Sequence, residues 1–441
     1  MASSQNHSVP TGAVHDHQVR DKDVRKIAMS AFVGTALEWY DFFLFGTASA
    51  LVFNHLYFAT EDPVTATLAS FATFGVGFLA RPLGAILFGK MGDKYGRKPA
   101  LLLSIVVIGV ATGVIGFLPD YHAIGMAAPI LLTVLRLLQG IAVGGEWGGA
   151  TTIAIEHAPP EKRGRYAAMV QLGSPVGTLL SSGAFALVVM LPDETVDSWG
   201  WRLPFLAAFP FLGVALWIRL KVEESPVYQQ LAEESENKPT GSLKELFAGY
   251  PKQTLYATFA AITGIGGFFI FTTYALSYGT QVLEFERQVV VNATLFAAAG
   301  QLVFLPFYGR LGERFGAGKV MGIGGIAAAV LAVPLWMLID SQNTVLMTLA
   351  ICIGIWTISA PYGVVGVLLG EMFPAHIRYT GMAITSNIAG AISGLLPFLA
   401  TYINSFFEEQ SSVSAMLLLI VISLLTALGG IMGAQYKHEE Q

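Results

Sequence analysis

The chain has 441 residues, of which 54% are hydrophobic and only 12% are charged, about half the usual charged share of a soluble domain. Twenty-five Lys and Arg with 30 Asp and Glu are too few to cover a soluble fold of this length, and the apolar content excludes intrinsic disorder. One cysteine excludes a disulfide framework and a multi-cysteine metal site. The net charge of -5 gives no support for a nucleic-acid partner. The composition is that of a polytopic membrane protein.

Apolar runs long enough to cross about 30 Å of hydrocarbon follow one another along the chain. A polar tail, 1–26, without the apolar core of a signal peptide precedes them. The first six predicted spans are 27–52, 64–89, 100–118, 124–154, 166–191 and 203–219. A cytoplasmic central loop, 220–253, leads to spans at 254–278, 289–308, 319–339, 344–370, 380–403 and 413–433, followed by a short cytoplasmic tail, 434–441. The sequence therefore predicts an N-terminal bundle at 27–219 and a C-terminal bundle at 254–433.

The basic residues predict the orientation of these spans. Of the 25 Lys and Arg, 21 lie in segments on the same side as the N-terminus, whereas the outer segments hold only Arg202 and Arg287. Cytoplasmic loops carry an excess of Lys and Arg. We therefore expect a multi-pass protein of the plasma or inner membrane, surrounded by lipid bilayer, with both termini in the cytoplasm.

The two halves of the chain repeat each other. The segment Gly92–Gly96 recurs as Gly312–Gly316, a shift of 220 residues. Glu156 with Arg163 seven residues later recurs as Glu371 with Arg378. Matching positions in each half indicate a duplication, and two six-helix bundles around a central pathway are the architecture of many secondary transporters.

Several motifs resemble those of one known family. The segment Gly92–Lys98, between the second and third spans, resembles the signature of the major facilitator superfamily. Glu38–Phe42, Arg81–Gly84, Arg136–Gly140 and Gly144–Gly149 resemble its metabolite:proton symporter family, which includes shikimate, 2-oxoglutarate, citrate and proline/betaine carriers.

Gly144–Gly149 and Trp199–Arg202 are most similar to the shikimate-type branch, and the resemblance covers nearly the whole chain after the tail. It implies an all-α fold of twelve transmembrane helices in two pseudo-symmetric six-helix bundles. We expect no cofactor and no bound metal, with the proton as coupling ion.

Two carboxylates, Glu38 and Asp41, lie about midway through the first span. Three residues apart on a helix, they share one face, with Cβ atoms about 5–6 Å apart. Two carboxylates that close in a low-dielectric site do not both ionise easily, so one should hold a proton near neutral pH. We expect this pair to carry the coupling proton. The alternative is that both only accept hydrogen bonds that fix helix contacts.

Arg136 lies in the fourth span about 18 Å from its outer end, near the middle of the membrane. A guanidinium there needs either a span-one carboxylate or an anionic substrate as partner. We favour exchange, with carboxylate pairing when the site is empty and substrate pairing when it is loaded. The alternative is a permanent ion pair with Glu38 or Asp41. Gln139, one turn further along, shares the face of Arg136.

Polar and aromatic side chains complete the expected substrate site. The C-terminal spans contain no full charge, and their polar groups suit a small hydroxylated or ring-shaped solute, although any one of them is more often a packing residue. The expected substrate-binding residues are Arg136, Gln139, Trp39, Tyr40, Gln171, Tyr274, Gln301, Trp356 and Asn387.

The cytoplasmic loops are expected to form a gate. The resemblance implies that Asp93 faces a helix N-terminus in the other half and that Arg97 pairs with an acid such as Glu156. Ala317 replaces the counterpart of Arg97, so the lock of the second half should be weaker. The alternative is a basic loop that only sets orientation. The expected gating residues are Gly92, Asp93, Gly96, Arg97, Arg81, Glu146, Glu156, Arg163, Glu313, Arg314, Glu371 and Arg378.

The sequence thus predicts a proton-coupled symporter, rather than an enzyme, that imports a small organic acid by alternating access. A shikimate-like solute or another small carboxylate is expected as substrate, and the protein is expected to be a monomer. One alternative is a proton-coupled proline or betaine symporter, although only about eight residues follow the last span, where osmosensing members often carry a coiled coil. A second alternative is a membrane receptor that does not transport.

Overall fold

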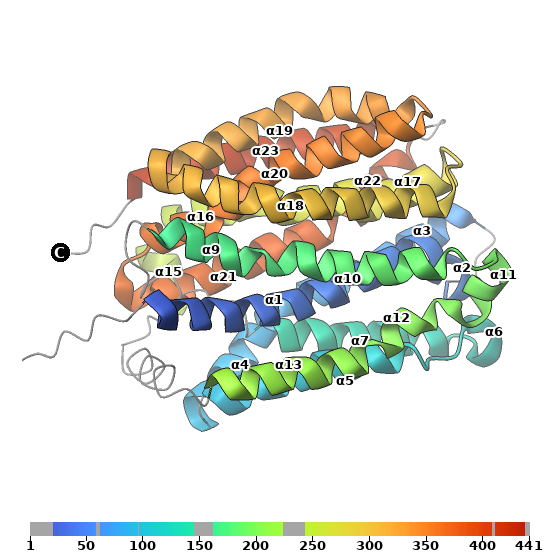
Figure 1. Ribbon diagram of the computed structural model, residues 1–441, viewed down its shortest axis with the longest axis horizontal. Coiled ribbons are helices and arrows are strands. Elements are labelled where there is room, and N and C mark those ends of the chain that lie inside the picture. The colour runs from blue at the N-terminus through green and yellow to red at the C-terminus, as the bar shows by residue number, and fades with distance from the viewer. Residues whose placement is uncertain are drawn as a thin grey trace, which may run out of the picture.

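The computed structural model describes residues 21–58, 62–95, 97–144, 162–223, 243–407 and 411–436. These residues form helices and connecting turns, with no strand among them. Most of the helices run along the long axis of the molecule (Figure 1). The first described helix begins and the last one ends at the same end of the molecule, on the left in Figure 1. We call it the terminal end and the other one the opposite end.

Helices occupy each of the first six predicted spans. They are α1 (Asp21–Ala48) with η1 (Ser49–Phe53) and α2 (Asn54–Leu56); α3 (Pro63–Leu79) and α4 (Arg81–Tyr95); α5 (Arg97–Ile115); α6 (Tyr121–Ile124) and α7 (Ala127–Val143); α9 (Arg163–Gln171) and α10 (Gly173–Val188); α11 (Asp193–Thr195), η3 (Val196–Gly200), α12 (Arg202–Leu206) and α13 (Ala208–Glu223). The fourth span is predicted to reach residue 154, but the part after Gly144 lies outside the described residues.

The second half is also helical throughout its predicted spans. Its elements are α16 (Pro251–Phe269), η4 (Ile270–Tyr274) and α17 (Ala275–Gln281); α18 (Arg287–Phe315); α19 (Ala317–Asp340); α20 (Thr344–Met372); α21 (Ala375–Gly394) and α22 (Leu396–Asn404); α23 (Val413–Gly433) and η5 (Ala434–Tyr436). A short helix, α15 (Leu243–Gly249), forms within the segment predicted as the central loop.

The described helices differ in the length and apolar character of their sequences. Eight helical stretches of the described residues are long and apolar enough to cross a membrane, and Leu102–Ile115 and Ala127–Val143 are shorter apolar helices. The helices of the first and fifth predicted spans are not among them. These two, α1 and α9–α10, contact each other; in the second half, α9 and α10 contact α18, and α1 contacts η4. Helices that face protein on several sides can carry the polar side chains that lipid-facing helices cannot.

Close glycine contacts bring α7 against α3 and α4. A Cβ atom on Gly140 would lie 1.9 Å from the carbonyl oxygen of Gly77, and one on Gly84 would lie equally close to that of Ile141. Small residues let membrane helices approach to backbone contact. This contact places Arg136 of α7 against α3 and sets Arg81 of α4 beside Gly144.

The two halves of the chain meet at both ends of the molecule. At the terminal end, α9 packs on α18 and α20. At the opposite end, α3 packs on α22 and η1 contacts α17. Between these contacts, α21 lies along α3 and α4. The buried side chains of the middle of the molecule therefore come from both halves.

Candidate transport site

Two buried arginine–carboxylate pairs lie at the middle of α1. Arg136 Nη1 lies 3.1 Å from Asp41 Oδ2, and Arg81 Nη2 lies 2.8 Å from Glu38 Oε1. Asp41 is 1% exposed and Glu38 is 3% exposed. The three-residue spacing predicted two carboxylates that oppose each other's ionisation. In the structure, each carboxylate is paired with an arginine of its own. The positive charge comes from two different helices, α4 and α7.

Asp41 accepts hydrogen bonds from three side chains. Thr112 Oγ1 and Gln139 Nε2 each lie 2.5 Å from Asp41 Oδ1, while Arg136 Nη1 binds Oδ2. The Thr112 hydroxyl also lies 2.7 Å from the carbonyl oxygen of Ile108. A hydroxyl has one proton, so Thr112 donates to Asp41 or to Ile108, but not to both at once. A protonated Asp41 donates to Thr112 while Thr112 donates to Ile108, so this cluster accommodates both protonation states of Asp41.

Arg136 is enclosed by protein. It is 0% exposed, and its Nε lies 3.4 Å from the carbonyl oxygen of Phe74. Its Nη2 has no hydrogen-bond partner within the described part of the chain. Four phenyl rings surround its guanidinium within cation–π range, those of Phe42, Phe45, Phe74 and Phe78. All these partners belong to the first half of the chain.

Arg81 connects the two halves. Its Nε donates to Asn387 Oδ1 of α21 at 3.2 Å, and Asn387 Nδ2 donates to the carbonyl oxygen of Gly144 at the end of α7. Arg81 is buried and lies over the rings of Phe42 and Phe78. The sequence assigned Arg81 to a gate and Asn387 to the substrate site; the structure places them in one hydrogen-bonded group.

A cavity of about 30 Å³ lies between the halves beside the Arg81–Glu38 pair. This volume admits a water molecule but not a metabolite. We call it the central cavity; it is lined by Glu38, Trp39, Arg81, Gln171, Ala261, Ile265, Tyr362, Val365 and Ser386. Gln171 Nε2 donates to the carbonyl oxygen of Tyr362 at 3.4 Å, whereas Gln171 Oε1 has no partner among the described residues.

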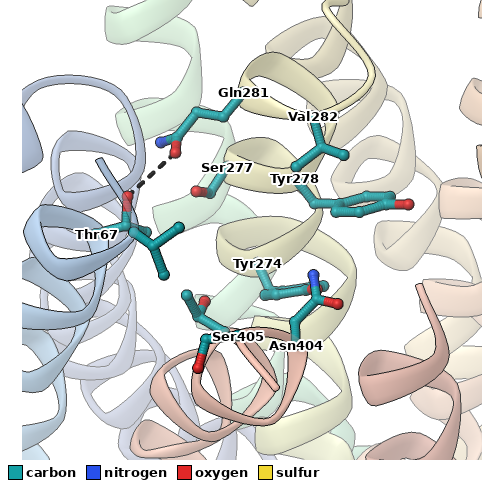
Figure 2. Close-up of a pocket in the computed structure, with 10 residues that line it drawn as sticks. Thr67, Tyr274, Ser277, Tyr278, Gln281, Val282, Asn404 and Ser405 are labelled. Carbon is teal, nitrogen blue, oxygen red and sulfur yellow. Dashed lines mark hydrogen bonds between the residues drawn. The ribbon is translucent and has the colours of Figure 1, made fainter. Parts of the chain in front are cut away.

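A second cavity opens between the halves at the opposite end, and Figure 2 shows its lining. Thr67 of α3 projects toward Gln281 of α17, and the Thr67 hydroxyl donates to Gln281 Oε1 at 3.1 Å (Figure 2). Gln281 Nε2 in turn donates to the carbonyl oxygen of Ala50 at 3.3 Å. Hydroxyl and amide groups of η4, α17 and α22 line the remainder, including Tyr274, Ser277, Tyr278 and Asn404.

The other expected substrate residues contact their own half of the chain. Tyr40 donates to the carbonyl oxygen of Pro204, Gln301 to Ser359, and Trp356 to the carbonyl oxygen of Ala297. Tyr274 lies against Ser414 and lines the cavity of Figure 2. The structure therefore places Trp39, Gln171 and Asn387 beside the Arg81–Glu38 pair. Tyr40, Gln301, Trp356 and Tyr274 lie elsewhere.

Among the residues that the structure describes, one ion pair joins the halves at the terminal end. Arg165 of α9 donates to Glu313 of α18 through its backbone N–H, at 2.8 Å from Oε1, and through Nε, at 3.0 Å from Oε2. A Cβ on the neighbouring Gly164 would lie 2.5 Å from the carbonyl oxygen of Gly309. Arg378 donates to the carbonyl oxygen of Phe373 in its own half.

The remaining gating residues are placed only in part. Arg163 begins α9, Arg314 lies over the Phe315 ring and Glu371 lies in the last turn of α20. Gly92 and Asp93 lie near the end of α4, and Arg97 begins α5. Gly96, Glu146 and Glu156 lie outside the described residues, so the pairing of Arg97 with Glu156 stays a prediction.

Three residues of these clusters were missed by sequence reasoning. Thr112 shares an apolar span with one other hydroxyl residue, Ser104, and Tyr362 follows a proline in another span; neither position carries a signal without its neighbours in space. Arg165 lies two residues beyond Arg163, and the sequence shows both as basic residues of one segment. The sequence does not show which of the two arginines faces the other half.

Known proteins are similar to this chain in sequence and in fold. Residues 27–256 match the family model "Sugar (and other) transporter", and residues 288–437 match "Major Facilitator Superfamily". The inner membrane metabolite transport protein YhjE of Escherichia coli K12 is 35% identical over 94% of this chain and 95% of its own length. The shikimate transporter of the same organism is 37% identical over 92% and 94%, and its proline/betaine transporter is 33% identical over 95% and 85%.

Solved structures agree with these matches at the level of the fold. A D-xylose–proton symporter superposes with a TM-score of 0.72 at 18% identity, covering 94% of this chain and 98% of its own. The helical membrane fold and its relatives define a membrane transporter, not an enzyme. The chain belongs to the major facilitator superfamily, and its relatives include an inner membrane metabolite transport protein and a shikimate transporter.

Proposed function

We propose that this transporter imports a small organic acid together with a proton by alternating access. The observation that carries the proposal is the pair of buried arginine–carboxylate contacts, Arg81–Glu38 and Arg136–Asp41, beside a cavity between the halves. An arginine paired with a protein carboxylate can equally bind the carboxylate of a solute. The site is therefore suited to exchange one anion for the other.

This exchange couples the transport of the solute to the transport of a proton. When a solute carboxylate takes the arginine, the displaced Glu38 or Asp41 is left as a buried carboxylate without its cation. An unpaired buried charge is strongly unfavourable, so the displaced group binds a proton. Asp41 has a ready acceptor for that proton in Thr112, as its hydroxyl can turn to Ile108. One solute anion then moves with at least one proton, and no further cofactor is required.

The orientation and state of assembly belong to the same proposal. We assign the terminal end to the cytoplasm because the basic residues gather in the segments on that side. The opposite end, with the cavity of Figure 2, then faces outward. Both bundles come from one chain, and we assign transport to the monomer.

Flux in proteoliposomes tests the proposed function. Purified protein is reconstituted, an inward proton gradient is imposed, and uptake of labelled shikimate and other small carboxylates is followed. We expect accumulation above equilibrium that an uncoupler abolishes. Uptake of no carboxylate, or uptake unaffected by the uncoupler, would contradict the proposal.

A proton-coupled osmolyte carrier is the second candidate. Proline/betaine transporters are among the relatives, and the rings of Trp39 and Tyr362 line the central cavity together with Glu38. Aromatic faces beside a carboxylate suit a quaternary ammonium group. The same proteoliposomes distinguish the two: proton-driven uptake of betaine that carboxylates do not inhibit would favour the osmolyte carrier.

A further inference from the structure

We propose that Arg81 holds the carboxylate of the transported solute and that Gln171 Oε1 accepts a hydrogen bond from a hydroxyl group of the same solute. The solute is then a hydroxycarboxylate. This inference rests on the proposed function and adds to it the residues that select the substrate. It gives the anchoring role to Arg81, where the sequence pointed to Arg136.

The position of the two arginines favours Arg81. Arg81 and its partner Glu38 line the central cavity, and Arg136 does not. Arg136 is enclosed by four phenyl rings, and its polar contacts among the described residues are with the first half. Arg81 instead reaches Asn387 of the second half. A solute that must contact both halves therefore reaches Arg81 before it reaches Arg136.

The hydrogen bonds of Arg81 also favour it. Nη2 binds Glu38 and Nε binds Asn387, while Nη1 makes no hydrogen bond to any residue that the structure describes. A solute carboxylate that displaces Glu38 can bind Nη1 and Nη2 together, in the bidentate geometry that a guanidinium prefers. Asn387 keeps the guanidinium in place during the exchange because it holds the separate Nε.

Gln171 supplies the second contact. Its side chain is 3% exposed and lines the same cavity. The amide nitrogen already donates to Tyr362, so the oxygen that lacks a partner is an acceptor. A buried acceptor without a donor is unfavourable, and a solute hydroxyl removes that cost. A quaternary ammonium group has no N–H or O–H to offer, so Gln171 selects against such a solute.

The central cavity contains groups of both halves around this contact. Arg81, Glu38 and Gln171 come from the first half, whereas Tyr362 and Ser386 come from the second. A solute held between them needs more room than the present 30 Å³, so the halves must separate to admit it. Closure over the solute then brings Tyr362 and Ser386 back onto it.

Binding measurements on detergent-purified protein test the inference without a proton gradient. The probes are shikimate, quinate, malate and lactate, each beside its analogue without hydroxyl groups, which are cyclohexene carboxylate, cyclohexane carboxylate, succinate and propionate. Isothermal calorimetry gives the affinities. We expect at least one hydroxycarboxylate to bind wild-type protein tenfold or more tightly than its analogue.

Two variants separate the two contacts. Arg81→Lys keeps the positive charge opposite Glu38 but loses the bidentate geometry of the guanidinium. It should weaken the binding of hydroxycarboxylate and analogue alike by tenfold or more. Gln171→Leu should abolish the preference for the hydroxylated probe and change the affinity for its analogue by less than threefold. Arg202→Lys and Gln288→Leu are matched controls outside the central cavity and should bind as wild type.

The outcomes are decisive in both directions. Normal binding by Arg81→Lys with loss of binding in Arg136→Lys would return the anchor to Arg136 and overturn the inference. An unchanged preference in Gln171→Leu, or no binding of any hydroxycarboxylate by wild-type protein, would overturn it as well. The expected binding pattern without proton-driven flux would support these contacts and contradict the proposed coupling, so the two failures are distinguishable.

Discussion

At the residue scale, the cluster around Asp41 differs from the one around Glu38. Asp41 is hydrogen-bonded to Arg136, Gln139 and Thr112, all from the first half, and is not among the described residues that line the central cavity. Glu38 lines that cavity and shares Arg81 with Asn387. One carboxylate is placed to respond to the solute, and the other is enclosed with a hydroxyl that can reverse its hydrogen bond.

Replacing the proton carrier by its amide should uncouple transport. Glu38→Gln and Asp41→Asn each imitate the protonated form, so the variant that removes the coupling group should lose accumulation driven by a pH gradient. Counterflow exchange should survive, because exchange does not require release of the proton. Asp340→Asn is a control, since Asp340 lies at the end of α19 and binds Tyr278 and Ser412. Full proton-driven accumulation in both test variants would show that neither acid carries the proton.

Removing one partner of the Arg136–Asp41 pair should destabilise the protein more than removing both. Arg136→Ala leaves the buried Asp41 carboxylate without its cation, at a cost of about 3–5 kcal/mol. The double variant Arg136→Ala with Asp41→Ala has no unpaired charge and should recover part of the loss in Tm. Thermal denaturation followed by intrinsic fluorescence measures this. Losses in the single variants Arg136→Ala and Asp41→Ala that add up to the loss in the double variant would mean that the pair contributes no coupling energy.

At the scale of elements, the contact of α7 with α3 and α4 positions both arginines. The helices approach to backbone distance at Gly77, Gly84 and Gly140. Arg136 and Arg81 consequently lie beside the same two rings, Phe42 and Phe78. A wider separation of α7 from α4 would break the link from Asn387 to Gly144.

A methyl group at this helix contact should lower stability. In Gly84→Ala the new Cβ would lie 1.9 Å from the carbonyl oxygen of Ile141, so the helices must move apart. Overpacking of this kind costs about 1–3 kcal/mol. Gly213→Ala in α13 is the control, because a Cβ there has no neighbour within 4 Å and alanine favours the helix by about 1 kcal/mol. We expect a lower Tm for the first and an equal or higher Tm for the second; the reverse order would contradict the contact.

At the scale of the whole molecule, ion pairs join the halves at both ends. Arg165 binds Glu313 at the terminal end. At the opposite end, Arg287 of α18 lies 3.3 Å from Asp197 and 3.7 Å from Asp193. Alternating access requires that one of these contacts opens while the other stays closed.

Breaking the contact at the terminal end should favour the conformation that is open at that end. Breaking the contact at the opposite end should favour the conformation that is open there. Partly exposed ion pairs contribute up to about 1 kcal/mol, so each change should alter the population ratio by up to about fivefold. Glu313→Gln should lengthen the distance between spin labels on α9 and α18, and Arg287→Gln that between labels on α3 and α22. Each variant is the control for the other. The same shift in both, or none, would show that these pairs do not hold the halves.

The sequence by itself determined the features that depend on local composition. The length of apolar runs predicted the helices, the motifs indicated the superfamily, and Glu38, Asp41 and Arg136 stood out because charge is costly in a membrane. The division into bundles and the gate of Arg97 with Glu156 remain predictions. Only the tertiary structure decided that Arg81 pairs with Glu38, that Arg136 is enclosed by phenyl rings, and that Gln171 borders the central cavity. These contacts join helices far apart in the chain, and they depend on how closely the glycines let those helices approach, which no local pattern encodes.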